Sequence, residues 1–173
     1  MTHEYLKGLQ EELVQEKVNL LYLHAPVTNG AIFVISSCFY FIMREKLDAD
    51  YLLLWLCFIL LTAALRLLIW RQHQTKPERL TAPQWLHLYT LATGLVGVVW
   101  ASLYILGYGN FDLLVLLALF LILFGVLSAA VTVLSCHIPI FVVYTYPMMI
   151  VFSGVLFISH EATSTLLMAI VFI

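Results

Sequence analysis

The stretch DLLVLLALFLILFGVLSAAVTVL, residues 112–134, decides the fold class of this chain. After its first residue it holds no Lys, Arg, Asp or Glu, and its apolar residues form a continuous run. An α-helix rises 1.5 Å per residue, so about 20 apolar residues cross the roughly 30 Å hydrocarbon layer of a bilayer. The stretch is therefore expected to be a transmembrane helix.

Apolar runs of this kind recur along the chain and are separated by short polar connections. The last run is shorter than a full span and is still apolar at Ile173, so we expect a sixth helix that is cut off within its span. The sequence therefore predicts an all-α, polytopic transmembrane helical bundle. Its spans, about six in number, are expected at 24–43, 51–70, 85–106, 112–134, 138–158 and 162–173.

The composition indicates the same class. Hydrophobic residues make up 63% of the 173 residues and charged residues 10%, against about 25% charged in an ordinary soluble domain. The lipid bilayer is therefore the expected partner of most side chains. A net charge of −2 provides no basic surface for nucleic acid. Cys38, Cys57 and Cys136 have no paired spacing that would predict disulfides or a zinc site.

The first 23 residues differ from the rest because they are amphipathic. One helical face collects the leucines Leu6, Leu9, Leu13 and Leu20. Charged residues occupy much of the remaining surface, as in a helix with one buried side. We therefore divide the chain into a cytoplasmic lead-in helix at 1–23 and a transmembrane domain at 24–173. The lead-in is expected to pack on its own bundle or on a second copy, or to be merely solvated.

The distribution of basic residues predicts the orientation of the helices. Cytoplasmic loops carry an excess of Lys and Arg. With the N-terminus inside, the basic residues on the outer side are only Arg44 and Lys46. Those on the cytoplasmic side are Lys7, Lys17, Arg71, Lys76 and Arg79. We therefore expect a cytoplasmic N-terminus, and six crossings return the C-terminus to the same side.

Arg66 is the basic residue that falls inside a predicted span. It lies one helical turn before Trp70, so its side chain could extend to the cytoplasmic headgroups while its stem stays in the membrane. Alternatively, it makes a contact inside the bundle, since charged residues within membranes often mark functional sites. No acidic residue occupies a span at matching depth. An internal partner would be a backbone carbonyl, a hydroxyl or His87.

Histidines and a proline complete the candidate site residues. His87 and His137 would lie near the cytoplasmic ends of different helices, as would His24. Histidines on different helices can ligate a haem, but none of these lies deep in a span, so we predict neither a metal nor a cofactor. Pro147 removes one backbone hydrogen bond from the fifth span and should kink it. Tyr144 supplies a nearby hydroxyl, and the kink could be a hinge or a static bend.

Small residues at four-residue spacing predict where helices approach closely. Gly97 with Ala101, and Gly125 with Ala129, form two such steps in neighbouring spans. Small side chains let backbones come together where the hydrophobic effect cannot drive helix association. We therefore expect the third and fourth helices to contact each other at these positions.

Aromatic residues near the ends of the runs fit the predicted boundaries. Trp and Tyr favour the headgroup level of a membrane, because their rings are apolar but carry one polar atom. On this reasoning, Trp85 and Tyr89 are expected at the cytoplasmic interface and Trp100 at the outer one.

Four segments together resemble a known class of membrane module. They are EKVNLLYLHAPVTNGAIFV from residue 16, LTAALRLLIWRQHQTKPERL from 61, WLHLYTLATGLVGVVWA from 85 and SAAVTVLSCHIPIFVVYTYPMMIVF from 128. In order, they show a proline at the start of the first span, Leu-Arg-Leu-Leu before a basic loop, Gly-x-x-Gly before a Trp, and a tight turn with two spaced prolines. This pattern resembles the N-terminal six-helix membrane sensor module of bacterial GGDEF/EAL diguanylate cyclases and histidine kinases.

The resemblance implies a sensory input and dimerisation module in the bacterial inner membrane. Such a module regulates a C-terminal output domain, for example a cyclic-di-GMP or kinase domain, and a hydrophobic small molecule is a suitable signal for it. The chain carries no residues of those output domains and no catalytic motif, so we expect no enzyme within it. The alternatives are a small transporter or channel subunit and a structural subunit of a membrane complex.

Overall fold

The computed structural model describes residues 2–106 and 113–158, which form α-helices joined by short turns. The helices are α1 (Thr2–Met43), α2 (Ala49–Thr75), α3 (Ala82–Leu106), α4 (Leu113–Leu134) and α5 (Ile138–Ile158), with a 3₁₀ helix η1 (Pro77–Arg79) before α3. Each of these five α-helices is long and apolar enough to cross a membrane. The all-helical prediction is confirmed for the described residues, and the sixth span expected at 162–173 lies outside them.

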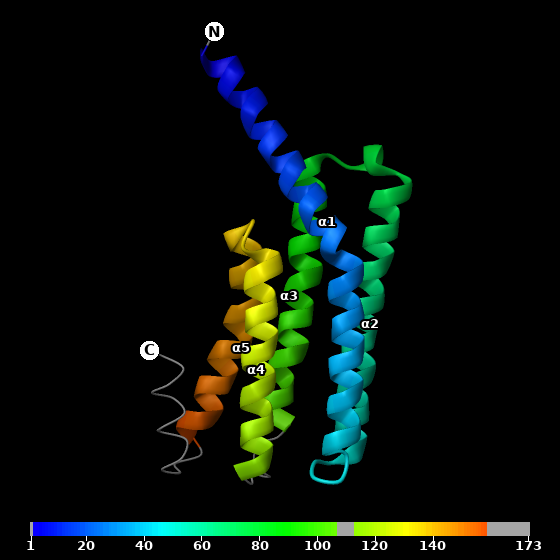
Figure 1. Cartoon of the computed structure of the whole chain (residues 1–173), viewed down its shortest axis with the longest axis vertical. Helices are drawn as coiled ribbons and strands as arrows, with labels where there is room; N and C mark the ends of the chain where they lie inside the picture. The colour runs from blue at the N-terminus through cyan, green and yellow to red at the C-terminus, as the bar shows by residue number, and fades with distance from the viewer. Residues whose placement is uncertain (1, 107–112, 159–173) are drawn as a thin grey trace.

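Helix α3 lies at the centre of the bundle (Figure 1). It packs most extensively on α5, and also on α2 and α1, while α1 pairs with α2 and α4 with α5. Because their turns are short, α1 and α2 form one antiparallel hairpin and α4 and α5 another. In contrast, α1 and α4 touch over a much thinner contact. The two hairpins are therefore held together mainly through α3.

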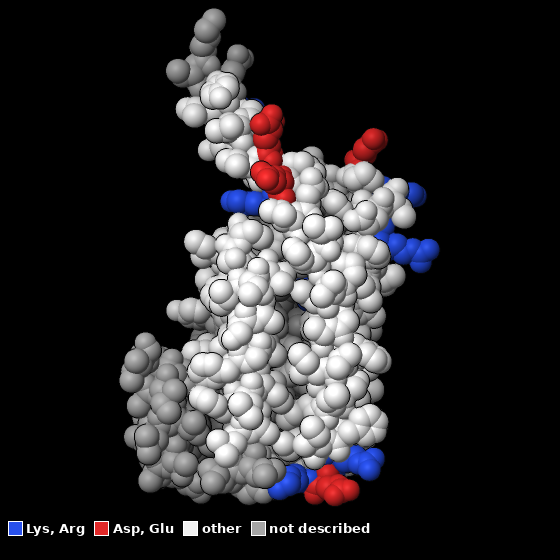
Figure 2. All heavy atoms as spheres, viewed as in Figure 1, with Lys and Arg blue, Asp and Glu red and all other residues white. Residues whose placement is uncertain are grey.

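Charged side chains gather at the two ends of the bundle, and the face between them is uncharged (Figure 2). One end carries the α1–α2 turn, with Arg44, Glu45, Lys46, Asp48 and Asp50. The other end carries the α2–α3 connection and the charged first half of α1. Five apolar helices whose surface charges gather at the ends of the bundle are typical of a membrane-embedded protein.

The predicted lead-in and first span form one helix, since α1 continues without interruption through Pro26. Burial against the bundle begins around Val18, which is fully buried. Before that point the leucine face is open, with Leu6, Leu9 and Leu13 55%, 44% and 48% exposed. The described bundle therefore leaves this face uncovered, and a second copy or solvent remains as its expected neighbour.

Side-chain caps explain where α2 and α3 begin. The Asp48 carboxylate accepts hydrogen bonds from the backbone N–H groups of Asp50 and Tyr51, at 3.1 and 3.4 Å. These are donors that a helix N-terminus leaves without a partner. At the start of α3, the Gln84 side chain accepts from the N–H of Thr81 at 2.9 Å, as in one half of a capping box. The two caps help to set the starting points of α2 and α3.

A close backbone contact at Gly97 joins α3 to α5. A Cβ atom at Gly97 would overlap the carbonyl oxygen of Tyr144 and lie 3.0 Å from its carbonyl carbon. Ala101, one turn further on, is also buried, whereas Gly125 faces open space and Ala129 is exposed. The expected contact between the third and fourth helices is therefore wrong. Small steps occur widely in apolar helices, and of the two predicted ones, the step at Gly97 is where a neighbouring backbone comes close enough to need a small residue.

Candidate functional site

Arg66 lies inside the bundle and makes an internal contact. Its side chain is 5% exposed. Nη2 donates a hydrogen bond to the Tyr89 hydroxyl at 2.8 Å, and a longer one to Thr28 Oγ1 at 3.4 Å. Its Cζ atom also lies 5.2 Å from the centroid of the Tyr89 ring, which is a cation–π geometry. Of the two expected arrangements, the structure has the internal one, with hydroxyls as partners.

The charge of Arg66 has no anionic partner among the described residues. The Asp and Glu side chains of the described residues lie in the first half of α1 and at the two ends of α2 and its connections. All of them lie toward the charged ends of the bundle, away from Arg66. Nε of Arg66 is buried without any hydrogen-bond partner, and the same is true of Thr93 Oγ1 and Trp100 Nε1. Buried polar atoms are normally paired. Three unpaired polar atoms from residues that line one cavity therefore indicate a place for an occupant.

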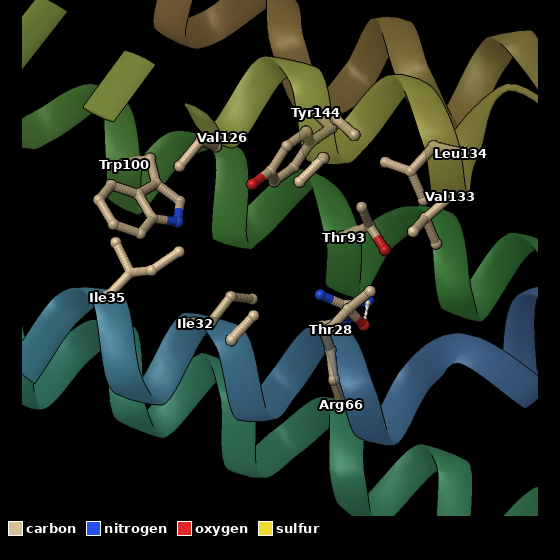
Figure 3. Close-up of a pocket in the computed structure, with 13 residues that line it drawn as sticks. Thr28, Ile32, Ile35, Arg66, Thr93, Trp100, Val126, Val133, Leu134 and Tyr144 are labelled. Atoms are coloured by element: carbon tan, nitrogen blue, oxygen red, sulfur yellow. Dashed lines mark hydrogen bonds between the residues drawn. The ribbon is translucent and has the colours of Figure 1, made fainter. Parts of the chain in front are cut away.

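The cavity lies between the helices (Figure 3) and has a volume of about 60 Å³. All five described helices contribute to its wall, through side chains that include Thr28, Arg66, Thr93, Trp100, Val126 and Tyr144. Figure 3 shows the Tyr144 hydroxyl and the Trp100 indole nitrogen directed toward the middle of this space. Arg66 extends into it from α2, beside Thr28. The polar groups of four helices thus converge on one small cavity.

The remainder of the wall is apolar and opens toward the lipid between α1 and α4. Ala31 and Ile35 of α1 and Ala129 of α4 line the cavity and are exposed on the surface of the bundle. The space-filling view shows this face hollowed between the two helices (Figure 2). Their thin contact leaves the gap open. The cavity therefore combines a cationic inner end with an apolar opening.

Two of the predicted site residues, Arg66 and Tyr144, are brought together in the cavity. His87 is exposed on α3 and lines only a shallow surface hollow. His137 lies in the turn between α4 and α5, where burial and the positive charge of Lys17 lower its pKa. The structure therefore separates both histidines from the arginine, and His87 is not its partner.

Pro147 lies inside the continuous helix α5 and is half-buried. It has no N–H to donate to the carbonyl of Val143. Val143 and Tyr144 are also where α3 packs, because a Cβ at Gly94 would meet the Val143 side chain and one at Gly97 the Tyr144 backbone. The proline therefore removes a hydrogen bond from the turn that places Tyr144 in the cavity. Its role as a hinge stays a prediction.

Sequence reasoning missed Thr28, Tyr89, Thr93 and Trp100. Tyr89 and Trp100 lie near the ends of their apolar run, which predicts a position at the membrane interface, yet both are almost fully buried inside the bundle. Thr28 and Tyr89 are 38 and 23 positions from Arg66 in the chain, so no local spacing connects them. The usable signal was the presence of hydroxyl side chains within otherwise apolar runs.

Comparison with known proteins does not assign a function to this site, and the described residues around it do not form a metal site. No protein-family model, curated protein or solved structure matches the chain. Within residues 2–106 and 113–158, no group of three His, Cys, Asp or Glu side chains is placed to hold a metal ion. Function is therefore inferred from the chemistry of Arg66 and its cavity.

We expect the double substitution Arg66→Met with Tyr89→Phe to raise the thermal stability of the purified bundle. Replacing buried ionic groups by apolar ones of similar volume is often stabilising, by about 1–4 kcal/mol. Arg66→Met alone should gain less, because it leaves the buried Tyr89 hydroxyl unpaired. Thermal unfolding in a neutral detergent, followed by circular dichroism, measures the change.

Arg71→Met, at an exposed position of the same helix, is the control. A double variant less stable than wild type would mean that Arg66 holds the fold together.

Proposed function

We propose that this chain is the membrane-embedded sensory input and dimerisation module of a bacterial signalling protein. The four segments that resemble six-helix sensor modules support this role, and so does a bundle of helices suited to a membrane. In this role the chain catalyses no reaction itself. It regulates a C-terminal output domain, either a cyclic-di-GMP domain of the GGDEF or EAL type or a histidine kinase.

One observation carries the sensory role: Arg66, whose charge no carboxylate of the described residues offsets, lies in a cavity whose wall takes side chains from all five described helices. Ligand sites in helical bundles typically form between helices. A molecule in this cavity contacts every described helix, so its binding can favour one arrangement of the bundle over another. A ligand shifts such an equilibrium by the difference in its affinity for the two states. A hydrophobic small molecule from the bilayer is therefore a suitable signal.

The transporter or channel alternative has less support. Secondary transporters typically bind their substrates at helices that are broken near the middle of the membrane. Helices α1 and α5 each contain a proline, at Pro26 and Pro147, yet both continue through it. A structural subunit of a complex, the other alternative, has no need of a buried arginine beside a cavity in which no described carboxylate offsets its charge.

The proposed module lies in the bacterial inner membrane with both termini in the cytoplasm. The excess of basic residues at the end of the bundle that carries the α2–α3 connection supports this orientation. The open leucine face of α1 supports a homodimer, because the first part of α1 projects beyond the other described helices (Figure 1) and its Leu6, Leu9 and Leu13 are exposed. A second copy could cover these side chains through the same face.

The output of the intact protein tests the proposal. We expect the coding sequence after residue 173 to continue into a GGDEF or histidine kinase domain, whose activity is measured in membranes. Arg66→Gln should change that activity at least about fivefold, the lower end of typical allosteric coupling.

Arg71→Gln is the matched control, since Arg71 is exposed on the same helix, and it should leave the activity unchanged. Equal activities from the two variants, with both proteins inserted in the membrane, contradict the sensory role. A continuation into a transporter domain contradicts it as well.

A further inference from the structure

The polar atoms left without a partner at the Arg66 cavity are mainly hydrogen-bond donors. Arg66 Nε and Trp100 Nε1 are buried donors without a partner, and neither of these groups can accept a hydrogen bond. Thr93 Oγ1 is also unpaired and can donate. The guanidinium adds a positive charge that no carboxylate of the described residues offsets. An occupant that satisfies Arg66 and Thr93 carries a negative charge and more than one acceptor oxygen.

The size of the cavity limits the head of this occupant. Sites for drug-sized ligands are typically about 300–1,000 Å³, whereas this cavity measures about 60 Å³. Sugar, nucleotide and glycerophosphate groups are therefore too large for it. A carboxylate is small and planar, and its two oxygens match the parallel N–H donors of a guanidinium.

The opening of the cavity accommodates a hydrocarbon chain. In Figure 3 the side chains of Ile32, Ile35 and Val126 lie together to one side of Arg66. The opening between α1 and α4 is lined by Ala31 and Ala129, both exposed on the surface of the bundle. A chain that starts at the arginine can therefore leave the bundle sideways through an apolar gap.

We infer that the Arg66 cavity binds the carboxylate of a single-chain amphiphile, such as an unesterified long-chain fatty acid. The carboxylate accepts hydrogen bonds from Arg66 and Thr93, and the tail leaves between α1 and α4. The inference rests on the proposed function, because it names the chemical class of the signal. Binding itself is measured without any output domain, so the two proposals fail separately.

Quenching of tryptophan fluorescence by dibromostearate tests this binding. Trp100 lines the cavity, so bromine atoms on a bound tail lie close enough to quench it. The protein is placed in phosphatidylcholine nanodiscs at about pH 9, so that the fatty acid is mostly ionised although the low dielectric of a bilayer raises the pKa of its carboxyl group. We expect saturable quenching that palmitate reverses. The methyl ester has the same tail without the charge and should bind about 10- to 100-fold more weakly.

Two pairs of variants locate the head and the tail. Arg66→Gln should weaken dibromostearate binding about 10- to 100-fold, whereas Arg71→Gln should not change it. Ala129→Phe should block the tail while leaving Arg66 in place. Val131→Phe, at an exposed position of α4 that does not line the cavity, should bind like wild type. The second pair keeps the inference testable even if Arg66→Gln fails to fold.

Three results would overturn the inference. The first is equal binding of dibromostearate and its methyl ester, which would mean that the charge is not recognised. The second is equal binding by Ala129→Phe and Val131→Phe, which would place the tail elsewhere. The third is displacement of the probe by phosphatidylglycerol as readily as by palmitate, which would assign the site to a phosphodiester headgroup. If one of these three results is obtained but Arg66→Gln still alters the output, the sensory role stands and only the ligand class is wrong.

Discussion

A leucine at position 97 is expected to prevent stable assembly of the bundle. Even a Cβ atom at Gly97 would overlap the carbonyl oxygen of Tyr144 and lie 3.1 Å from its Cα. The obstacle is backbone, which cannot rotate away as a flexible side chain can, so α3 and α5 must separate. Overpacking costs about 1–3 kcal/mol, and we expect Gly97→Leu to lose about 3 kcal/mol or more. A lower thermal midpoint in detergent and a smaller yield of monodisperse protein measure this loss.

A matched glycine in α4 provides the control for this substitution. Gly125 also lies in an apolar helix, but a Cβ there meets nothing within 4 Å. Gly125→Leu should therefore leave the thermal midpoint nearly unchanged, and Gly97→Ala should fall between Gly97→Leu and wild type. If Gly97→Leu and Gly125→Leu unfold at the same temperature, the close approach of α3 and α5 is not what stabilises the bundle.

The positions of the helices could be predicted because the signals for them are local. The span expected at 138–158 coincides with α5, and the one at 85–106 begins three residues after the start of α3. Run length, charged connections and capping residues are all read within a few positions of each helix end. The lead-in at 1–23 and the span at 24–43 were separated by composition, yet helical backbone continues across that boundary.

The inward faces of the helices could not be predicted, because the apolar spans are apolar on nearly all sides. In α4, Leu119 and Leu123 are almost fully buried, whereas Leu117 and Leu121 are 46% and 70% exposed. The four residues are identical, so no hydrophobic periodicity separates them. The neighbouring helices decide which leucines are buried, and that information is not local.

The candidate site could not be predicted for the same reason, because its residues are brought together by contacts between helices. The sequence marked Arg66 as unusual and left open whether it faced the lipid headgroups or the bundle. The choice depends on Tyr89 and Thr28, which lie on other helices. Both Tyr89 and Trp100 carry the features of interfacial aromatic residues, an apolar ring with one polar atom, and those features suit a polar cavity inside a bundle equally well.

Truncation of Trp85 tests whether this side chain packs inside the bundle or lies at the headgroup level of the membrane, and its expected effect is large. It is 2% exposed, and its Nε1 donates a hydrogen bond to the carbonyl of Pro77 at 3.0 Å. The rings of Tyr22 and His73 pack on it at 5.9 and 5.2 Å between centroids. Trp85→Ala would leave a void where α1, α2 and α3 meet. We expect a loss of about 3–5 kcal/mol, as for other buried tryptophans.

A tryptophan at the headgroup level would behave differently, since most of its ring would face lipid and truncation would remove little packing. Exposed substitutions usually stay within about 0.5 kcal/mol, and Tyr51→Ala, at a residue 59% exposed, provides that reference. Trp85→Phe keeps most of the ring and loses the hydrogen bond to Pro77, worth about 1 kcal/mol. The unfolding temperature should therefore fall in the order wild type, Trp85→Phe, Trp85→Ala. If Trp85→Ala and Tyr51→Ala unfold together near wild type, the aromatic cluster of Tyr22, His73 and Trp85 does not hold the three helices together.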